Sequence, residues 1–158
     1  MEKVIFLDVD GVLNCDTSTS NCGLYAGIDN DKVKRLRRIV EVTSAHIVLC
    51  SSWKDEWYCE PFKDDQSELA NYLDRKLKRE RLCIMGKTKD DWHHRGAGIL
   101  KYINMHPTIK QFIILDDELF DYEQYTRLMK NLVKTDPCVG LQDDDVERAI
   151  ELLNKEEV

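Results

Sequence analysis

The first apolar run of the chain is Lys3-Val4-Ile5-Phe6-Leu7-Asp8-Val9-Asp10-Gly11-Val12-Leu13, which spans residues 3–13. A short, continuously apolar segment that ends in acidic residues and a glycine is typical of a buried parallel strand followed by a turn. We therefore predict a strand over Lys3–Val9. Side chains alternate along a strand, so Asp8 and Asp10 are expected on the same face, beside Gly11, where the chain can bend.

Outward from this segment, short apolar runs alternate with amphipathic ones, which predicts a parallel sheet covered by helices, an α/β fold. Residues 14–28 are rich in Asn, Ser, Thr and Gly, and we expect a loop there. The expected strands are Lys3–Val9, His46–Cys50, Leu82–Met85, Gln111–Leu115 and Leu132–Thr135. The expected helices are Asn30–Ser44, Gln66–Arg81, Gly96–Met105, Tyr122–Lys130 and Asp143–Asn154.

Composition limits the class of protein. The 158 residues, of which 42% are hydrophobic and 34% charged, are enough for one domain with an ordinary core, and we expect residues 1–158 to form it. The net charge of −7 is the wrong sign for a protein whose whole surface binds nucleic acid. No apolar run has the length of a membrane span or a signal-peptide core, so we expect a soluble, cytoplasmic protein with six free thiols.

Polar side chains follow three of the expected strands. In an open parallel sheet, ligands bind outside the carboxyl ends of the strands, so these side chains are expected to form one site. They are Asp8 and Asp10 after the first strand, Ser51 and Ser52 after the second, and Asp116 and Asp117 after a later one. Close carboxylates repel one another, and a hard divalent cation relieves that repulsion. The four aspartates therefore predict a Mg²⁺ site.

The segments 5–13, 47–51 and 112–117 resemble three sequence motifs of the haloacid dehalogenase (HAD) superfamily of phosphohydrolases. The resemblance implies a Rossmann-like, doubly wound parallel sheet. The superfamily's remaining motif is a lone Lys or Arg, for which Arg95 is the first choice by position and Lys87 the second. Shorter motifs resemble the capless subgroup found as a domain in some RNA-repair proteins, and polynucleotide 3′-phosphatase domains.

Carried over by position, the resemblance implies a catalytic role for each matching residue. Asp8 becomes the nucleophile that forms an aspartyl-phosphate, and Asp10 the general acid and base. Ser51 and the backbone N–H groups after it would hold the phosphoryl group, and Arg95 would neutralise its charge. Ser52 stays an alternative to Ser51. Either acid of the later pair can be the direct metal ligand.

The gaps between the motifs are too short for a cap domain, which predicts an open cleft and admits a large phosphorylated substrate. Basic clusters at 34–38 and 75–79 can follow a phosphate backbone or form solvated helix faces. A nucleotide or a short nucleic-acid end is the expected substrate. Trp92, His93 and His94 can form a rim of the cleft or an exposed loop. The rival hypothesis is a non-catalytic, receiver-like phospho-acceptor or binding module.

Overall fold

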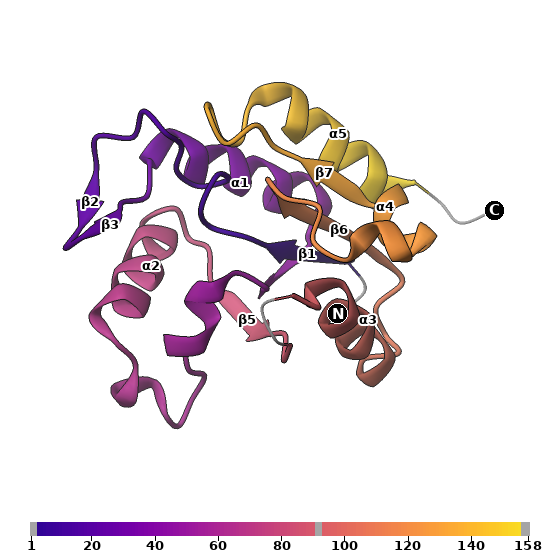
Figure 1. Ribbon diagram of the computed structural model, residues 1–158, viewed down its shortest axis with the longest axis horizontal. Coiled ribbons are helices and arrows are strands. Elements are labelled where there is room, and N and C mark those ends of the chain that lie inside the picture. The colour runs from indigo at the N-terminus through magenta and orange to yellow at the C-terminus, as the bar shows by residue number, and fades with distance from the viewer. Residues whose placement is uncertain (1–2, 91–92, 156–158) are drawn as a thin grey trace.

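A parallel sheet of five strands forms the centre of the molecule, in the order β5-β4-β1-β6-β7 (Figure 1). The computed structural model describes residues 3–90 and 93–155. The strands are β1 (Lys3–Leu7), β4 (His46–Leu49), β5 (Ile84–Lys87), β6 (Gln111–Asp116) and β7 (Leu132–Lys134). Since β1 pairs with β4 on one side and β6 on the other, the three segments that carry the polar strand ends are direct neighbours.

Helices cover both faces of this sheet. The α-helices are α1 (Asn30–Thr43), α2 (Glu68–Arg79), α3 (Arg95–Met105), α4 (Thr126–Lys130) and α5 (Asp143–Asn154), and the 3₁₀ helices are η1 (Ser52–Glu56), η2 (Lys63–Asp65) and η3 (Tyr122–Gln124). Ile5 and Leu7 of β1 pack with residues of α1, α2 and α5, whereas Val4 and Phe6 pack with residues of α3 and α4. Alternate β1 side chains thus pack against helices on opposite faces of the sheet, which confirms the doubly wound α/β fold.

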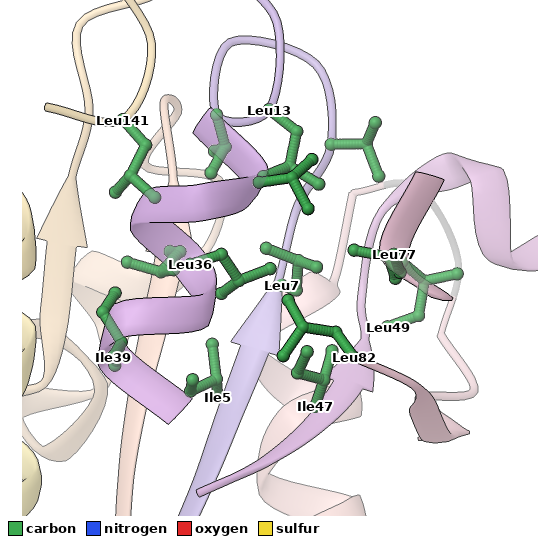
Figure 2. Packing of buried hydrophobic residues seen from close by; sticks show 14 of the residues in the cluster. Ile5, Leu7, Leu13, Leu36, Ile39, Ile47, Leu49, Leu77, Leu82 and Leu141 are labelled. Carbon is green, nitrogen blue, oxygen red and sulfur yellow. The ribbon is translucent and has the colours of Figure 1, made fainter. Parts of the chain in front are cut away.

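The packing on the α1 face fixes the strand ends. Figure 2 shows Leu36 and Ile39 of α1 over Ile5 and Leu7 of β1, and all four side chains are fully buried. Burying a Leu or Ile side chain contributes about 1.5–3 kcal/mol relative to leaving it exposed. The carboxyl edge of β1 is therefore held on a rigid support.

The end of β1 differs from the sequence prediction. The strand stops at Leu7 rather than Val9, and the Leu13 amide donates to the Val9 carbonyl at 2.8 Å. The chain is already turning at these residues, so the two-residue period of a strand no longer holds. The expectation that Asp8 and Asp10 share one face of a strand is wrong.

Two other strand predictions need correction. The expected loop 14–28 contains a small antiparallel hairpin, β2 (Asn21–Cys22) and β3 (Tyr25–Ala26), whose two-residue strands are too short to show periodicity. The edge strand β5 is Ile84–Lys87 and not Leu82–Met85. Because β5 includes Gly86 and Lys87, its bounds cannot be located from the pattern of apolar residues.

The predicted helix Tyr122–Lys130 is interrupted. It consists of η3 and then α4, with Tyr125 in an extended conformation between them. The predicted helix Asp143–Asn154 has the observed bounds of α5, and the other predicted helices, like the strands at His46–Cys50, Gln111–Leu115 and Leu132–Thr135, agree with the observed elements to within two residues at each end.

The segment between β4 and β5 contains η1, η2 and α2, and α2 packs into the central core through Leu73 and Leu77. This arrangement agrees with the predicted single domain without a cap. The six cysteines are free thiols, as expected. Within the described residues, no helix combines the length and apolar character that crossing a membrane requires.

Candidate active site

Three carboxylates meet at the carboxyl edge of the sheet. Asp8 follows β1, Asp116 ends β6 and Asp117 comes next. One oxygen from each lies within 4.8 Å of the other two. Asp8 and Asp116 are buried and Asp117 is half-buried. The sheet edge thus holds three acidic side chains around a space that one cation can fill.

A pocket of about 280 Å³ opens beside these carboxylates. Its lining residues are Asp8, Asp10, Ser52, Lys54, Asp90, Arg95, Asp117, Glu118 and Phe120. Five of them are acids and two are cations. The pocket therefore has an excess of negative charge, which favours an additional positive ion when an anionic substrate enters.

The buried acids affect the pKa of Asp8. Burial raises it to about 7, and the negative charge of Asp116 acts in the same direction. The charge of Arg95 and hydrogen bonds from the Val9 amide and the Ser51 hydroxyl lower it, without overcoming the effect of burial. Burial and Asp116 also raise the pKa of Asp117. Arg95 therefore does not fully compensate the negative charge of the three carboxylates.

These donors fit a hard divalent cation. The three ligand atoms are carboxylate oxygens, which Mg²⁺ and Ca²⁺ prefer over nitrogen or sulfur. Mg²⁺ keeps several waters and uses one or two protein carboxylates, so three nearby carboxylates supply enough ligands. A cation at this position would also offset the repulsion that raises the pKa of Asp8.

Arg95 ties the acids together from the first turn of α3. Its Nη1 lies 3.1 Å from Oδ1 of Asp8 and donates to Oδ2 of Asp116 at 2.7 Å. The guanidinium carbon lies 4.0 Å from the ring centroid of Phe120. The amide of Gly96 donates to Asp121 at 2.5 Å, which holds the start of the helix in place. Arg95 is therefore fixed beside Asp8.

The two acids at the end of β6 have different surroundings. Asp116 accepts hydrogen bonds from the Tyr122 hydroxyl at 2.7 Å and the Glu118 amide at 3.0 Å, in addition to the one from Arg95. Asp117 lines the pocket. Asp116 is thus held firmly by protein donors, while Asp117 faces the space where a ligand would bind.

The Asp10 carboxylate lies on the pocket wall but outside the group of three carboxylates. Its Oδ1 accepts from Nδ2 of Asn14 and its Oδ2 accepts from Nε1 of Trp53, both at 2.9 Å. Its carboxylate is not a member of the three-residue cluster of Asp8, Asp116 and Asp117. The structure brings Asp10 to the pocket wall, with its orientation set by two neutral donors.

Gly11 permits the close approach of the first loop to β6. Its φ is +71°, a conformation that costs most other residues energy. A Cβ atom at this position would lie 2.4 Å from the carboxyl carbon of Asp117. The glycine is required both for the turn after Asp10 and for the proximity of the two acidic segments.

The two serines after β4 occupy different positions. Ser51 is fully buried, its hydroxyl accepts from the Trp53 amide at 3.3 Å, and its side chain acts to lower the pKa of Asp8. Ser52 is half-buried and lines the pocket. Ser51 therefore stabilises the ionised form of Asp8 from a buried position, and Ser52 lies on the wall of the cavity.

Comparison with known families agrees with this arrangement. Residues 4–146 match the family described as HAD domain in Swiss Army Knife RNA repair proteins. The chain belongs to this HAD family. Membership indicates a hydrolase of the phosphatase type, in a superfamily that typically uses a divalent metal. No curated protein and no solved structure matches the sequence.

The pocket of this HAD domain also contains an ion pair that sequence reasoning missed. Nζ of Lys54 lies 3.3 Å from Oδ2 of Asp90, and the two side chains are only 5% and 2% exposed. Oδ1 of Asp90 accepts from the Thr88 hydroxyl at 2.6 Å. Its Oδ2 is buried and accepts no hydrogen bond from the described residues. The pair places a second buried cation in the pocket that contains Asp8.

A signal for this pair was present in the sequence. Asp90 follows the end of β5 by three residues, so it belongs to the same strand-end group as the other acids. The predicted strand Leu82–Met85 ended too early for Asp90 to be included. Lys54 lies in η1, just beyond the serines, where nothing in the local pattern indicates burial.

Lys87, the alternative to Arg95, lies outside the pocket. Its Nζ donates to the carbonyls of Lys54 and Trp57, each at 2.6 Å, and is 4.8 Å from the ring centroid of Tyr58. Burial lowers its pKa. Lys87 thus supports the η1 segment, and the structure brings only Arg95 to Asp8.

The rim suggested by Trp92, His93 and His94 is only partly described. Trp92 lies outside the described residues. His93 and His94 are exposed, and His94 directly precedes α3. Neither histidine lines the pocket beside Asp8.

Proposed function

We propose that this HAD domain is a Mg²⁺-dependent phosphomonoester hydrolase that acts through an aspartyl-phosphate on Asp8. The observation that carries the proposal is the cluster of Asp8, Asp116 and Asp117, whose oxygens lie within 4.8 Å of one another. Arg95 lies 3.1 Å from Asp8 in the same pocket. A nucleophile, a metal-ligand set and a cation thus adjoin one cavity, as phosphoryl transfer requires.

The first step forms the covalent intermediate. A carboxylate oxygen of Asp8 attacks phosphorus and forms an acyl-phosphate bond, while the bond from phosphorus to the leaving oxygen breaks. Protonated Asp10 gives its proton to that oxygen, so the product leaves as an alcohol. The neutral donors Asn14 and Trp53 hold Asp10 at the pocket wall throughout.

The second step regenerates the enzyme. Asp10, now a carboxylate, takes a proton from water, and the water oxygen attacks phosphorus. The bond between phosphorus and Asp8 breaks, which releases inorganic phosphate and the free carboxylate. Asp10 is protonated again for the next cycle.

The metal would be held by Asp8 together with Asp116 and Asp117. When bound, Mg²⁺ would reduce the repulsion between the Asp8 carboxylate and the anionic phosphoryl group. Arg95 keeps Asp8 oriented and contributes positive charge beside it. Lys54 adjoins the same cavity, and we assign it contact with the phosphoryl oxygens. Ser51 orients Asp8, and Ser52 faces the cavity.

We propose a phosphorylated nucleotide or nucleic-acid end as the substrate. The family description refers to RNA repair proteins, which act on nucleic-acid strands. The absence of a cap in the segment between β4 and β5 leaves room for a substrate larger than the pocket itself. These two facts support an end phosphate over the phosphate of a small enclosed metabolite.

Phosphate release from a 3′-phosphorylated oligonucleotide tests the proposal. We expect turnover by the wild type with Mg²⁺, and loss of at least about 10³-fold in Asp8→Asn, since the nucleophile is removed. Asp64→Asn, which changes an exposed aspartate in η2, is the matched control and should behave as wild type. Equal phosphate release by wild type and Asp8→Asn would overturn the assignment of Asp8.

A further inference from the structure

A second hollow adjoins the catalytic pocket at Asp10. Its volume is about 210 Å³. It is lined by Asp10, Tyr25, Ser52, Trp53, Asp55, Glu56 and Leu69. Asp10 and Ser52 line both cavities, so the two hollows meet at these side chains. Each hollow is smaller than an ordinary ligand pocket of about 300–1,000 Å³, but together they reach that range.

The orientation of Asp10 indicates which part of a substrate would lie at the junction between the two hollows. The indole N–H of Trp53 donates to Oδ2 of Asp10, and Trp53 is only 4% exposed. The carboxylate is therefore fixed on the boundary between the hollows. A general acid has to lie within about 2.6–3.2 Å of the oxygen that it protonates. With the phosphoryl group beside Asp8 and its leaving oxygen within reach of Asp10, the rest of the leaving group would extend into the second hollow, which Asp10 also lines.

The walls of the second hollow indicate what it can bind. Tyr25 lies on β3 of the hairpin, lines the second hollow and is 57% exposed, so that its ring is accessible to a ligand there. Leu69 of α2 supplies another apolar wall. An exposed aromatic ring provides a stacking surface for a flat group such as a nucleobase.

Two acidic side chains of the second hollow, Asp55 and Glu56, disfavour the binding of phosphate. Asp55 and Glu56 of η1 are exposed, and the structure gives neither an ion pair with another described residue. Carboxylates accept hydrogen bonds from hydroxyl and amino groups but repel phosphate. This wall therefore suits sugar hydroxyls or base amino groups, and disfavours a second phosphate in the same hollow.

We infer that the hollow beside Asp10 is a leaving-group site for a nucleoside, with the base against Tyr25 and Leu69 and hydroxyl or amino donors at Asp55 and Glu56. This inference rests on the proposed phosphatase function, and specifies its substrate. A nucleoside 3′-monophosphate fits best, because a further phosphate on the same nucleoside, as in a bisphosphate or a strand, would lie near Asp55 and Glu56 and be repelled.

Substitution of Tyr25 tests the stacking contact. Tyr25→Ala should raise KM for a nucleoside 3′-monophosphate by about five- to tenfold, because stacking on an aromatic side chain is lost. Turnover of glycerol phosphate, which has no base, should stay within about twofold. Phe62→Ala removes an exposed aromatic side chain that lines neither hollow, and should leave KM unchanged for both substrates. Equal effects of Tyr25→Ala on both substrates would overturn the inference.

The carboxylate wall is tested by charge. The double variant Asp55→Asn with Glu56→Gln should increase kcat/KM for a nucleoside 3′,5′-bisphosphate about tenfold relative to the 3′-monophosphate, since like-charge repulsion is removed. Asp64→Asn with Asp65→Asn, in η2, is the control of equal charge change and should leave the ratio unaltered. An unchanged ratio in the first variant would contradict a role for this wall.

Binding of adenosine, measured by calorimetry, provides a readout that does not depend on turnover. The wild type should bind it, and Tyr25→Ala should bind it at least about fivefold more weakly. If no substrate releases phosphate but adenosine binding depends on Tyr25, the proposed reaction fails and the nucleoside site stands. If phosphate is released but adenosine binding does not depend on Tyr25, the nucleoside site is wrong and the proposed reaction stands.

Discussion

Two regions of this domain carry basic side chains in very different surroundings. The first region comprises the outer faces of α1 and α2, where the sequence is most densely basic. There several arginines form ion pairs with acids of the same domain: Arg37 with Glu41 and Glu80, Arg38 with Glu147, and Arg75 with Glu68. Exposed pairs of this kind contribute about 0–1 kcal/mol each to stability.

The second region is the pocket beside Asp8, which contains two basic residues, Arg95 and Lys54. Their side chains are 9% and 5% exposed, and each lies against a buried carboxylate. Burying such charges costs several kcal/mol per ion before the partner compensates. We therefore expect phosphate to bind at the buried cations Arg95 and Lys54 rather than along the basic faces of the helices.

Replacement of Arg95 should have the largest effect. Arg95→Met removes the cation beside Asp8 and leaves two buried acids without their shared partner, so we expect kcat to fall by about 10³-fold. Arg95→Lys should recover part of the loss. Phosphate-release kinetics measure the effect, and circular dichroism checks the fold. A loss below about tenfold would remove Arg95 from the chemistry.

The Lys54–Asp90 pair should come next. Lys54→Met should lower kcat/KM by about 10²-fold, because a charge that contacts the phosphoryl group is lost. Lys54→Arg keeps the charge and should retain more activity. Asp90→Asn should cost only about tenfold, since it leaves the cation in place. If Asp90→Asn proves worse than Lys54→Met, the pair serves folding rather than phosphate binding.

A smaller effect is expected on the stability of the metal-free protein. The pKa of Asp8 is raised to about 7 in the fold from an ordinary value of 3.8. Its stabilising contribution is therefore complete below the ordinary value, and is lost as pH rises through about 7. From about pH 5 to about pH 8, the unfolding free energy of wild type should fall by about 2 kcal/mol relative to Asp8→Asn.

Denaturant titrations of both proteins, with chelator present, measure this difference. Added Mg²⁺ should reduce it, because the cation favours the ionised carboxylate. An identical pH dependence in wild type and Asp8→Asn would show that Arg95 already neutralises the cluster.

The basic helix faces should give the smallest effect. The double variant Arg38→Gln with Arg75→Gln should change the unfolding free energy by less than about 1 kcal/mol. Its KM for a 3′-phosphorylated oligonucleotide should stay within about twofold, because these side chains already have acidic partners. A several-fold rise in KM that disappears at high salt would instead indicate that these faces contact the strand.

Much of the fold could be predicted because its signals are local. The apolar runs ending at Asp8, Ser51 and Asp116 mark three neighbouring central strands, and parallel strands bring their carboxyl ends to one edge. That rule predicts Asp8, Asp10, Asp116 and Asp117 as one metal set, and the structure brings together three of them, without Asp10. Arg95 could be chosen from its position at the start of the helix before β6.

The remaining features depend on tertiary contacts. The direction of the Asp10 carboxylate is set by Trp53, which is 43 residues away in the chain, and by a turn that ends β1 early. Lys54 is buried by its ion pair with Asp90, although its local sequence is polar. The hairpin that presents Tyr25 has strands of two residues each, too short for any periodic pattern.

Trapping the covalent intermediate tests the central claim most directly. The Asp10→Asn variant, incubated with Mg²⁺ and an aryl phosphate whose leaving group needs no acid, should accumulate phosphate on Asp8, because the base for the second step is missing. Acid quenching, borohydride reduction and peptide mass analysis locate the modified residue. We expect reduction at position 8 in Asp10→Asn, dependent on Mg²⁺. Modification at another residue, or none while the wild type releases phosphate, would contradict this expectation.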